Sequence, residues 1–377
     1  MHLMSQIPTK AAAPDAGLDA WLQTAVGRGG DQFTPARDLV SVEAIRRMAE
    51  VVGDRNPIHL DPAFAANSVH GGLVASPASL LSYAQGGFEP LAGSHWVDAA
   101  GIRRFRLDPM PVRAAGVAVE RTPYEEVVER LKEAGFTSLA GVGGEMVVHR
   151  YARVGDRLHY SDQRIESIVG PKKTALGPGY FTTRLTTVRD QAGAPVAEIR
   201  LSSIIFAPPA AAPEQHRSET AGAEPESPLM PAGLLVESSR TLRRTEVFRG
   251  QTLPSLIVEG TPSLIVAGAL FNHDAMDVHH DPHWARRRGF QDVFMNTMTT
   301  QSLATRYVTD WAGPEAVVRR LAWRLGRQQY PHDTLYLTGA VTAAGVGADA
   351  TTDVEVTCRN SLGVHARVTL SLTLPGV

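Results

Sequence analysis

The sequence predicts an α+β fold built from two copies of one unit. Three observations support this: alternating strand-like segments follow an apolar helix in each part of the chain, a Pro- and Ala-rich segment separates the parts, and one polar motif occurs in each. With 377 residues, the chain has the length of two ordinary domains. We therefore expect each part to form strands around one apolar helix.

The composition is that of an ordinary globular protein. Hydrophobic residues make up 43% and charged residues 20%, and the formal net charge is -2, so no overall field attracts nucleic acid or an anionic membrane. The single cysteine, Cys358, excludes an intramolecular disulfide and a cysteine metal cage. The N-terminus has no apolar run typical of a signal peptide, and no stretch approaches about 18 apolar residues. We expect a cytoplasmic protein that binds neither nucleic acid nor membrane.

A linker is predicted at residues 207–233, where Pro, Ala, Glu and Ser replace β-branched and aromatic residues. Such a segment cannot bury enough apolar surface to fold. It divides the chain into an N-terminal domain at 34–206 and a C-terminal domain at 234–377. Residues 88–140 are less regular than anything in the second domain, and we expect this insertion to shape a pocket.

Local patterns predict three helices in the N-terminal domain. SVEAIRRMAEVVG (41–53) has helical spacing, with Ser41 as its candidate N-cap. LVASPASLLSYAQGG (73–87) is predicted to be a mostly apolar helix ended by glycines. TPYEEVVERLKEAG (122–135), inside the insertion, predicts an amphipathic helix.

Strands are predicted to complete each domain, because polar and apolar residues alternate there. In the C-terminal domain the predicted strands are 333–345, 348–360 and 365–375, and in the N-terminal domain they lie within 144–169, 179–190 and 195–207. GVGG (141–144) lacks the spacing of a phosphate-binding loop and precedes a strand, so it is predicted to be a turn.

A short polar motif occurs in both domains at a constant separation. DRNPIHLDPAFA (54–65) and DAMDVHHDPHWA (274–285) share an Asp, a His five residues later, and an Asp-Pro pair. The second copy lies 220 residues after the first, from Asp54 to Asp274 and from His59 to His279. Chance seldom produces such a match, so we infer that one fold was duplicated with its polar cluster.

The motif and its surroundings resemble the MaoC-like, or type 2, enoyl-CoA hydratases, which have the hotdog fold. FNHDAMDVHHD (271–281) and the segment 292–314 are similar to the small subunit of bacterial steroid side-chain hydratases, and the segments 71–81 and 143–158 to its partner subunit. The resemblance implies two hotdog domains, each an antiparallel sheet wrapped around a central helix. They would form a pseudo-dimer with the acyl pocket at their contact.

An Asp and a His at this spacing suit the addition of water to an α,β-unsaturated thioester. That reaction needs a base for the water, an acid for the α-carbon and a donor to the thioester oxygen. Burial can bring the pKa values of Asp and His, about 3.9 and 6.5, into a useful range. We expect Asp274 to position and deprotonate water and His279 to deliver the α-proton. Asp54 and His59 form either a second active site or a retained pair without turnover.

The two domains differ in the donor that each can offer to the thioester oxygen. In the resembled family it is a backbone N–H at the start of the central helix, about 18 residues after the His. This implies Thr297 in the C-terminal domain and Pro77 in the N-terminal domain, but proline has no N–H. The C-terminal domain is therefore predicted to be catalytic, and the N-terminal domain to hold the acyl group or the CoA arm. The substrate-binding candidates are Thr297, the preceding Asn296, and Asn56, which is expected to fix its loop through backbone hydrogen bonds.

Several of these residues have structural alternatives. Asp274 and His279 could be a capping Asp and a surface His beside a turn. Asp61 and Asp281, each followed by proline, are predicted to be helix N-caps. The basic run 286–288 is either a solvated helix face or a contact for the CoA phosphates.

No metal or cofactor is expected. HHDPH (279–283) contains zinc or iron ligand types, but the position of His280 is Leu60 in the first copy, and no Glu or Cys lies at ligand spacing nearby. The addition of water transfers neither electrons nor any other group, so it needs no cofactor.

The predicted function is reversible syn hydration of a trans-2-enoyl-CoA, with a bulky acyl group, to a 3-hydroxyacyl-CoA. The partner is an acyl-CoA or acyl-carrier thioester, and assembly as a homodimer is an open alternative. Two other functions stay open: a dehydratase or cyclase acting on a carrier-bound or free intermediate of natural-product (polyketide) biosynthesis, and a non-catalytic acyl-thioester binding partner of a hydratase. A hotdog thioesterase is disfavoured because such enzymes do not usually carry this Asp/His loop.

Overall fold

The computed structural model describes residues 16–85, 95–97, 99–105, 121–174, 177–207, 240–345, 347 and 350–376. We call the described residues 16–207 the N-terminal half and 240–376 the C-terminal half. The predicted linker at 207–233 lies outside the described residues except for Ala207, so the domain boundaries stay predictions.

The N-terminal half starts with helices and ends with long strands. Its helices are α1 (Ala16–Ala25), α2 (Val42–Val52), α3 (Pro57–Leu60), α4 (Pro62–Asn67), the 3₁₀ helix η1 (Pro77–Ala84) and α5 (Pro123–Glu133). Its strands are β1 (Phe33–Pro35), β2 (His95–Val97), β3 (Arg103–Phe105), β4 (Ser138–Val148), β5 (His159–Ser161), β6 (Arg164–Thr174), β7 (Gly177–Arg189) and β8 (Pro195–Phe206).

The C-terminal half repeats this order with a longer central helix. Its helices are η2 (Arg244–Glu246), α6 (Pro262–Phe271), η3 (Asp277–His279), α7 (Pro282–Arg287) and α8 (Thr297–Ala312). Its strands are β9 (Thr252–Gly260), β10 (Val317–Leu325), β11 (Asp333–Ala344), β12 (Thr352–Asn360) and β13 (Gly363–Thr373). The strands β9 and β10 are additional to those that the sequence predicted.

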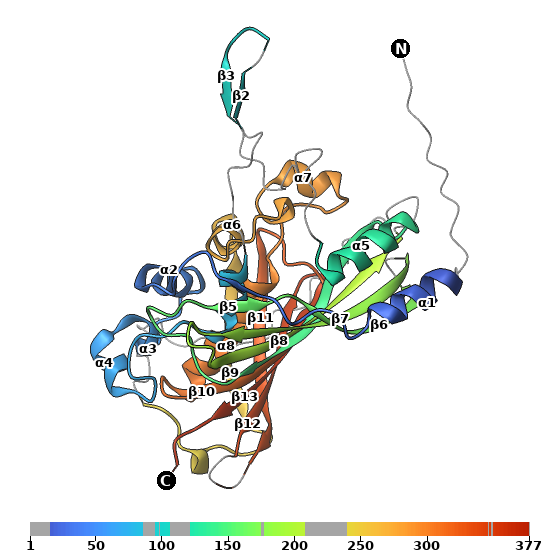
Figure 1. Cartoon of the computed structure of the whole chain (residues 1–377). Coiled ribbons are helices and arrows are strands. Elements are labelled where there is room, and N and C mark those ends of the chain that lie inside the picture. The colour runs from blue at the N-terminus through green and yellow to red at the C-terminus, as the bar shows by residue number, and fades with distance from the viewer. Residues whose placement is uncertain are drawn as a thin grey trace.

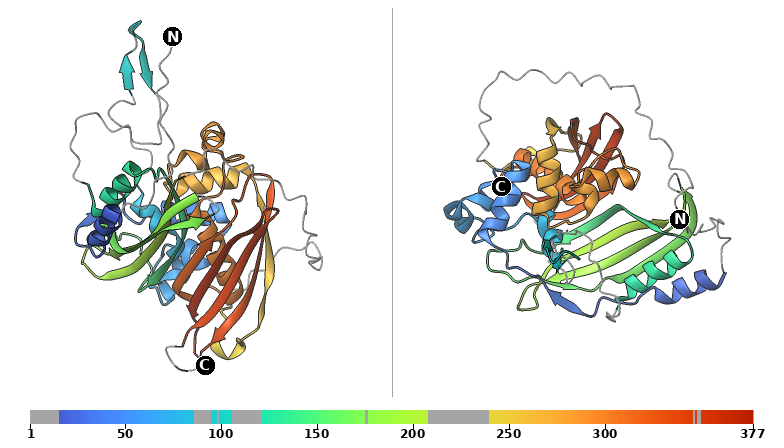
Figure 2. Two further views of the ribbon diagram at one scale, coloured as in Figure 1. Left: turned by 90° about the vertical axis from the view of Figure 1, so that its right-hand side faces the viewer. Right: turned by 90° about the horizontal axis from the view of Figure 1, so that it is seen from above.

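One antiparallel sheet joins the two halves. Among the described residues, eleven strands form it in the order β1-β5-β7-β8-β4-β10-β13-β12-β11-β9, with β6 paired to β7. The halves meet where β4 pairs with β10, and Figures 1 and 2 show the green strands of one half beside the orange and red strands of the other. The predicted α+β class, with antiparallel strands beside a central helix in each half, is therefore confirmed.

The prediction of a turn at GVGG was wrong, because these residues lie inside β4 at the junction of the halves. Gly143 and Gly144 pair with Arg324 and Trp323 of β10. A Cβ on Gly143 would collide with the carbonyl oxygen of Trp323, and a Cβ on Gly144 with its ring. The two glycines thus allow close backbone approach between the halves, a use of glycine inside a strand that local sequence does not distinguish from a turn.

The predicted apolar helix at 73–87 is shorter than expected. Ala75 donates its N–H to Ala152 O (2.8 Å) and Val74 forms a bridge with Arg153, so residues before Ser76 are held extended. The 3₁₀ helix η1 starts only at Pro77 and has 8 residues, against 16 in α8. The two central elements of the halves thus differ in type and length.

Other helices begin where the sequence predicts. The Ser41 hydroxyl accepts the N–H of Ala44 at the start of α2, and Thr122 and Glu125 form a capping box at the start of α5. Asp61 and Asp281 cap α4 and α7, each accepting two backbone N–H groups. The predicted N-caps Ser41, Asp61 and Asp281 are confirmed.

The hydrophobic core is shared between the halves. One cluster of buried side chains includes Ile45 and Leu80 from the N-terminal half with Leu303 and Leu370 from the C-terminal half. A second cluster places α1 and α5 against β6 and β7, at the flank of the molecule in Figure 1. In the described part of the chain, no helix is long and apolar enough to cross a membrane.

The insertion at 88–140 is only partly described. Its β2 and β3 pair with each other alone and stand apart from the main body in Figure 1. Residues 86–94 and 106–120 lie outside the described residues, so the pocket-shaping role of the insertion stays a prediction.

Candidate active site

The end of a helix places the acidic residue of each pair. Gly53 (φ 65°) and His273 (φ 55°) are both left-handed, and each turns the chain back on the preceding helix. The next residue then bonds to that helix: Asp54 N–H to Ala49 O at 2.8 Å and Asp274 N–H to Ala269 O at 2.9 Å. The same backbone geometry thus presents a carboxylate in each half.

The structure brings Asp and His together in both halves. His279 Nε2 lies 3.6 Å from Asp274 Oδ2, and His59 Nε2 lies 3.8 Å from Asp54 Oδ2. Both distances exceed a direct hydrogen bond, and a water lying to one side of the pair can hydrogen bond to both groups. The side chains are mostly buried, with 9% and 13% exposed for His279 and Asp274 and 7% for each residue of the first pair.

A backbone carbonyl fixes the orientation of each imidazole. His279 Nδ1 lies 2.7 Å from Phe294 O, and His59 Nδ1 lies 2.7 Å from Val74 O. A carbonyl oxygen can only accept, so Nδ1–H donates in both cases and the neutral ring has its lone pair on Nε2. Each histidine therefore points a proton acceptor at its partner carboxylate.

Burial favours the neutral form of His279. Desolvation lowers the pKa of His279 below its usual value, although Asp274 and the Phe294 carbonyl act in the opposite direction. At neutral pH the imidazole is then a base that can accept a proton at Nε2.

Asn296 connects the carboxylate to the start of α8. Its Nδ2 donates to Asp274 Oδ2 (3.1 Å), and its Oδ1 accepts the N–H of Thr299 (2.9 Å) as the helix N-cap. Thr297 is the first residue of α8, so its N–H has no partner within the helix. Thr297 is partly exposed whereas Asn296 is buried, so this helix start is accessible beside the Asp/His pair.

The corresponding place in the N-terminal half differs as the sequence predicted. Pro77 is the first residue of η1 and is buried, and Ser76 before it makes no side-chain cap bond. The other site candidate there, Asn56, accepts the N–H of Ile58 (3.1 Å), which confirms its loop-fixing role. A contact of Asn56 with substrate stays a prediction.

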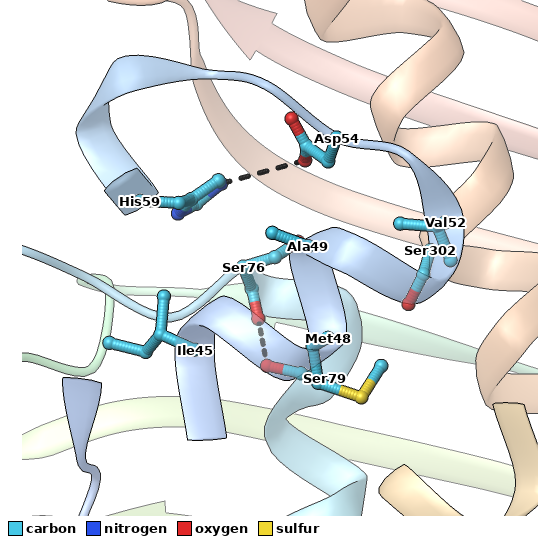
Figure 3. A pocket seen from close by; sticks show the side chains of 9 residues that line it. All are labelled: Ile45, Met48, Ala49, Val52, Asp54, His59, Ser76, Ser79 and Ser302. Carbon is cyan, nitrogen blue, oxygen red and sulfur yellow. Dashed lines mark hydrogen bonds and ion pairs between the residues drawn. The ribbon is translucent and has the colours of Figure 1, made fainter. Parts of the chain in front are cut away.

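A small pocket, with enclosed room for about one water, lies against the first pair. Figure 3 shows its lining residues: Ile45, Met48, Ala49, Val52, Asp54, His59, Ser76, Ser79 and Ser302. Ser302 belongs to α8, so this site is completed by the other half of the chain.

Sequence reasoning missed the residues that support α8. The pKa of His365 is lowered by burial, and its Nδ1–H donates to Arg327 O (2.6 Å). Its Nε2 lies 2.9 Å from the hydroxyl of Thr300 in the first turn of α8. No local pattern predicts this contact, because His365 stands in a strand 65 residues further along the chain.

The histidine-rich run 279–283 lies entirely within the described residues. Among the described residues, no three His, Cys, Asp or Glu side chains come together as metal ligands would. Within this run, His280 Nε2 lies 3.2 Å from Ala275 O. In the neighbouring basic run 286–288, the Arg286 guanidinium pairs with Asp292 at 3.0 Å.

The burial of His70 predicts that acid lowers the stability of the fold. It stacks on Tyr151 with ring centroids 4.4 Å apart, and its buried Nε2 has no hydrogen-bond partner among the described residues. Burial lowers its pKa from 6.5 to about 4, with smaller effects of His59, Arg153 and Arg319. Because the pKa of His70 is lower in the folded state, its neutral form favours folding above pH 6.5. This contribution to the unfolding free energy is lost as the pH falls.

We expect His70 alone to remove about 3 kcal/mol of unfolding free energy between pH 6.5 and 4. His70→Phe introduces the residue that the other half has at the matched position, Phe290. Urea unfolding at both pH values should show a smaller acid loss for this variant. An unchanged loss would contradict the assignment to His70.

Known proteins resemble parts of this chain in sequence. A family model described as FAS1-like, dehydratase domain region, matches residues 28–94. The sequence is 42% identical over 125 residues to the 3-oxo-4,17-pregnadiene-20-carboxyl-CoA hydratase β subunit of Mycobacterium tuberculosis. This match covers 33% of this chain and 95% of that one. The sequence is also 30% identical over 118 residues to the 3-hydroxybutyryl-CoA dehydratase of Methylorubrum extorquens. This match covers 30% of this chain and 72% of that one.

A further relative is longer than the matched region. The probable enoyl-CoA hydratase α subunit of Thermomonospora curvata is 34% identical over 191 residues, which are 51% of each chain. The chain thus spans about half the length of that relative.

Solved structures share the fold at low sequence identity. A MaoC-like dehydratase, 20% identical, matches with a TM-score of 0.63 over 94% of this chain and 100% of that one. A Mycobacterium tuberculosis protein described as having a double hotdog fold, 16% identical, matches with a TM-score of 0.57 over 93% and 98%. The predicted double hotdog fold is therefore confirmed.

Proposed function

This chain belongs to the MaoC-like family of hydratases and dehydratases, and from that premise we propose that it reversibly hydrates a 2-enoyl-CoA with a bulky acyl group. The observation that carries the proposal is the arrangement around Asp274: His279 Nε2 at 3.6 Å, and Asn296 linking the carboxylate to the start of α8. Relatives named as hydratases of enoyl-CoA and of a steroid carboxyl-CoA support the substrate class.

The geometry assigns each group a step. Asp274 and His279 hold one water, and neutral His279 takes its proton at Nε2 as the oxygen bonds to carbon 3 of the enoyl group. Asp274 then faces an imidazolium, which its charge stabilises. The same Nε2 returns the proton to carbon 2, so the elements of water are added and nothing else is consumed. The sequence suggested Asp274 as the base; we assign the proton instead to His279, because its Nδ1–H is held by Phe294 O and Nε2 is left as the acceptor.

The N–H of Thr297 holds the thioester oxygen during this step. Negative charge moves onto that oxygen when water attacks carbon 3, and a backbone N–H at a helix start stabilises it. Asp274, His279 and Thr297 therefore face the reacting atoms, and Asn296 positions the first of them.

The experiment that tests the proposal is a hydration assay with two thioesters. Crotonyl-CoA and a steroid enoyl-CoA are followed by the loss of their ultraviolet absorbance, and the 3-hydroxyacyl products by mass spectrometry. Hydration of the steroid thioester supports the proposal. Binding of both thioesters without hydration, and without dehydration of the 3-hydroxyacyl forms, would instead support a binding partner.

The dehydration direction is a second candidate. The match to a dehydratase-region model covers Asp54 and His59, and the same groups act in either direction. Acyl-carrier protein thioesters in the assay separate this use from CoA-dependent hydration. Homodimer assembly and cytoplasmic location stay predictions.

The pH dependence of the rate follows from the buried imidazole. Because the pKa of His279 is lowered from 6.5, the base form persists at neutral pH and is lost only on acidification below that value. We expect kcat/KM to fall on acidification with a midpoint below pH 6.5. A pH–rate profile measures this, and an acid limb centred above 6.5 would contradict a neutral His279.

A further inference from the structure

The N-terminal pocket is lined by the buried residue Ser302. Ser302 of α8 is 5% exposed, and its Oγ has no hydrogen-bond partner among the described residues. Figure 3 shows His59 and Ser302 at opposite ends of the pocket, with the α2 residues Ala49 and Met48 between them. A buried hydroxyl left without a partner is unfavourable for folding, so its persistence beside a cavity points to a ligand.

The matched position in the other half shows what a structural serine does there. Ser82 lies 220 residues before Ser302, and its hydroxyl donates to Asn272 Oδ1 at 2.5 Å. The residue 220 positions before Asn272 is Val52, which offers no such acceptor. Of these two serines at matched positions, Ser82 is therefore hydrogen-bonded, whereas Ser302 faces a pocket.

The C-terminal half fills the corresponding space. Asn272 Nδ2 donates to Gly268 O (2.7 Å) and Thr299 Oγ1 (3.2 Å), and a Cβ on Gly268 would collide with Thr299. In the N-terminal half this corner is open and lined by apolar α2 side chains. The filled corner requires the acyl group of a C-terminal substrate to extend elsewhere, whereas the N-terminal corner keeps a small pocket, which limits any acyl group there to a short one.

We propose that the N-terminal pocket is a second active site, for a short-chain 2-enoyl thioester, in which the Ser302 hydroxyl replaces the N–H that Pro77 lacks. The proposal rests on the reaction proposed above but uses other residues. Asp54 and His59 hold the water, and Ser302 donates to the thioester oxygen from across the junction. One O–H bond of water breaks, a C–O bond forms at carbon 3, and the proton passes through His59 to carbon 2.

The test removes the C-terminal pair with Asp274→Asn and His279→Ala together. We expect this double variant to lose steroid enoyl-CoA hydration by about 10²–10⁴-fold. Crotonyl-CoA hydration should fall by less than about tenfold, because its acid–base pair at Asp54 and His59 is intact. A double variant that retains its melting temperature but hydrates no crotonyl-CoA would overturn the proposal. If the double variant retained steroid hydration, this result would refute the function proposed for the C-terminal site and not the second site.

Two additions to the double variant test Ser302 itself. Ser302→Ala should lower the remaining crotonyl-CoA rate by about 10²-fold without lowering the melting temperature, because the hydroxyl makes no hydrogen bond with any described residue. Val52→Asn should abolish that rate, since an amide there would bind Ser302 and fill the pocket as Asn272 does with Ser82. A residual rate that neither change lowers would also overturn the proposal.

Ser82→Ala in the same background is the matched control. It removes the equivalent hydroxyl from the other half, where Asn272 depends on it. We expect a lower melting temperature and an unchanged crotonyl-CoA rate, the reverse of the result for Ser302→Ala. Equal effects of the two serine changes would assign Ser302 a purely structural role and contradict the proposal.

Discussion

Asp274→Asn and His279→Ala, made separately, each lower kcat for hydration of a bulky enoyl-CoA by about 10²–10⁴-fold. The amide cannot carry the negative charge that stabilises the imidazolium 3.6 Å away, and alanine removes the Nε2 that receives the proton. Stopped-flow or steady-state loss of enoyl absorbance measures the effect. The double change should be little worse than either single change, since the two groups act on one water.

Asp281→Ala is the control for this pair of variants. It removes the α7 N-cap that bonds the N–H groups of His283 and Trp284, so it should lower the unfolding free energy by about 0.5–2 kcal/mol. It touches neither the water site nor the start of α8, and kcat should not change. If Asp274→Asn lowered kcat no more than Asp281→Ala does, Asp274 would have only a structural role.

Asn296→Ala should lower kcat by about 10²–10³-fold, a loss comparable to that of an oxyanion donor. The change removes the Nδ2 bond that holds Asp274 Oδ2 and the Oδ1 cap that holds Thr299 N–H. The carboxylate and the helix start would both lose their fixed positions. The unfolding free energy should fall by about 0.5–2 kcal/mol because a cap is lost.

Asn296→Ser separates the two roles of this residue. Serine is as good an N-cap as asparagine, so it should restore much of the unfolding free energy. Its short side chain lacks the amide that reaches Asp274, so kcat should stay low. Recovery of kcat together with stability would show that Asn296 acts only as a cap.

The motif repeat predicted the pairs well because the spacing of Asp and His is local. Five residues across a helix end and a one-turn helix determine where Asp274 and His279 meet, and the same holds for Asp54 and His59. The helix start at Thr297 and the proline at Pro77 could likewise be placed by counting from each histidine. Short-range geometry of this kind is encoded in neighbouring residues.

The rest of the site depends on contacts between distant segments. Ser302 lines the pocket beside Asp54 from the other half, Ser82 reaches Asn272 across 190 residues, and His365 supports Thr300 from a strand. Only the assembled sheet brings these segments together. The glycines of β4 were misread for the same reason, since their partner Trp323 lies in β10.

The most direct measurement is a crystal structure of the Asp274→Asn variant with a bound steroid enoyl-CoA. We predict the thioester oxygen about 3 Å from Thr297 N, with carbon 3 facing His279 Nε2 and a water between residue 274 and His279. A thioester carbonyl bound away from the start of α8, with no water reachable from His279, would contradict the assignment of hydration to the C-terminal half.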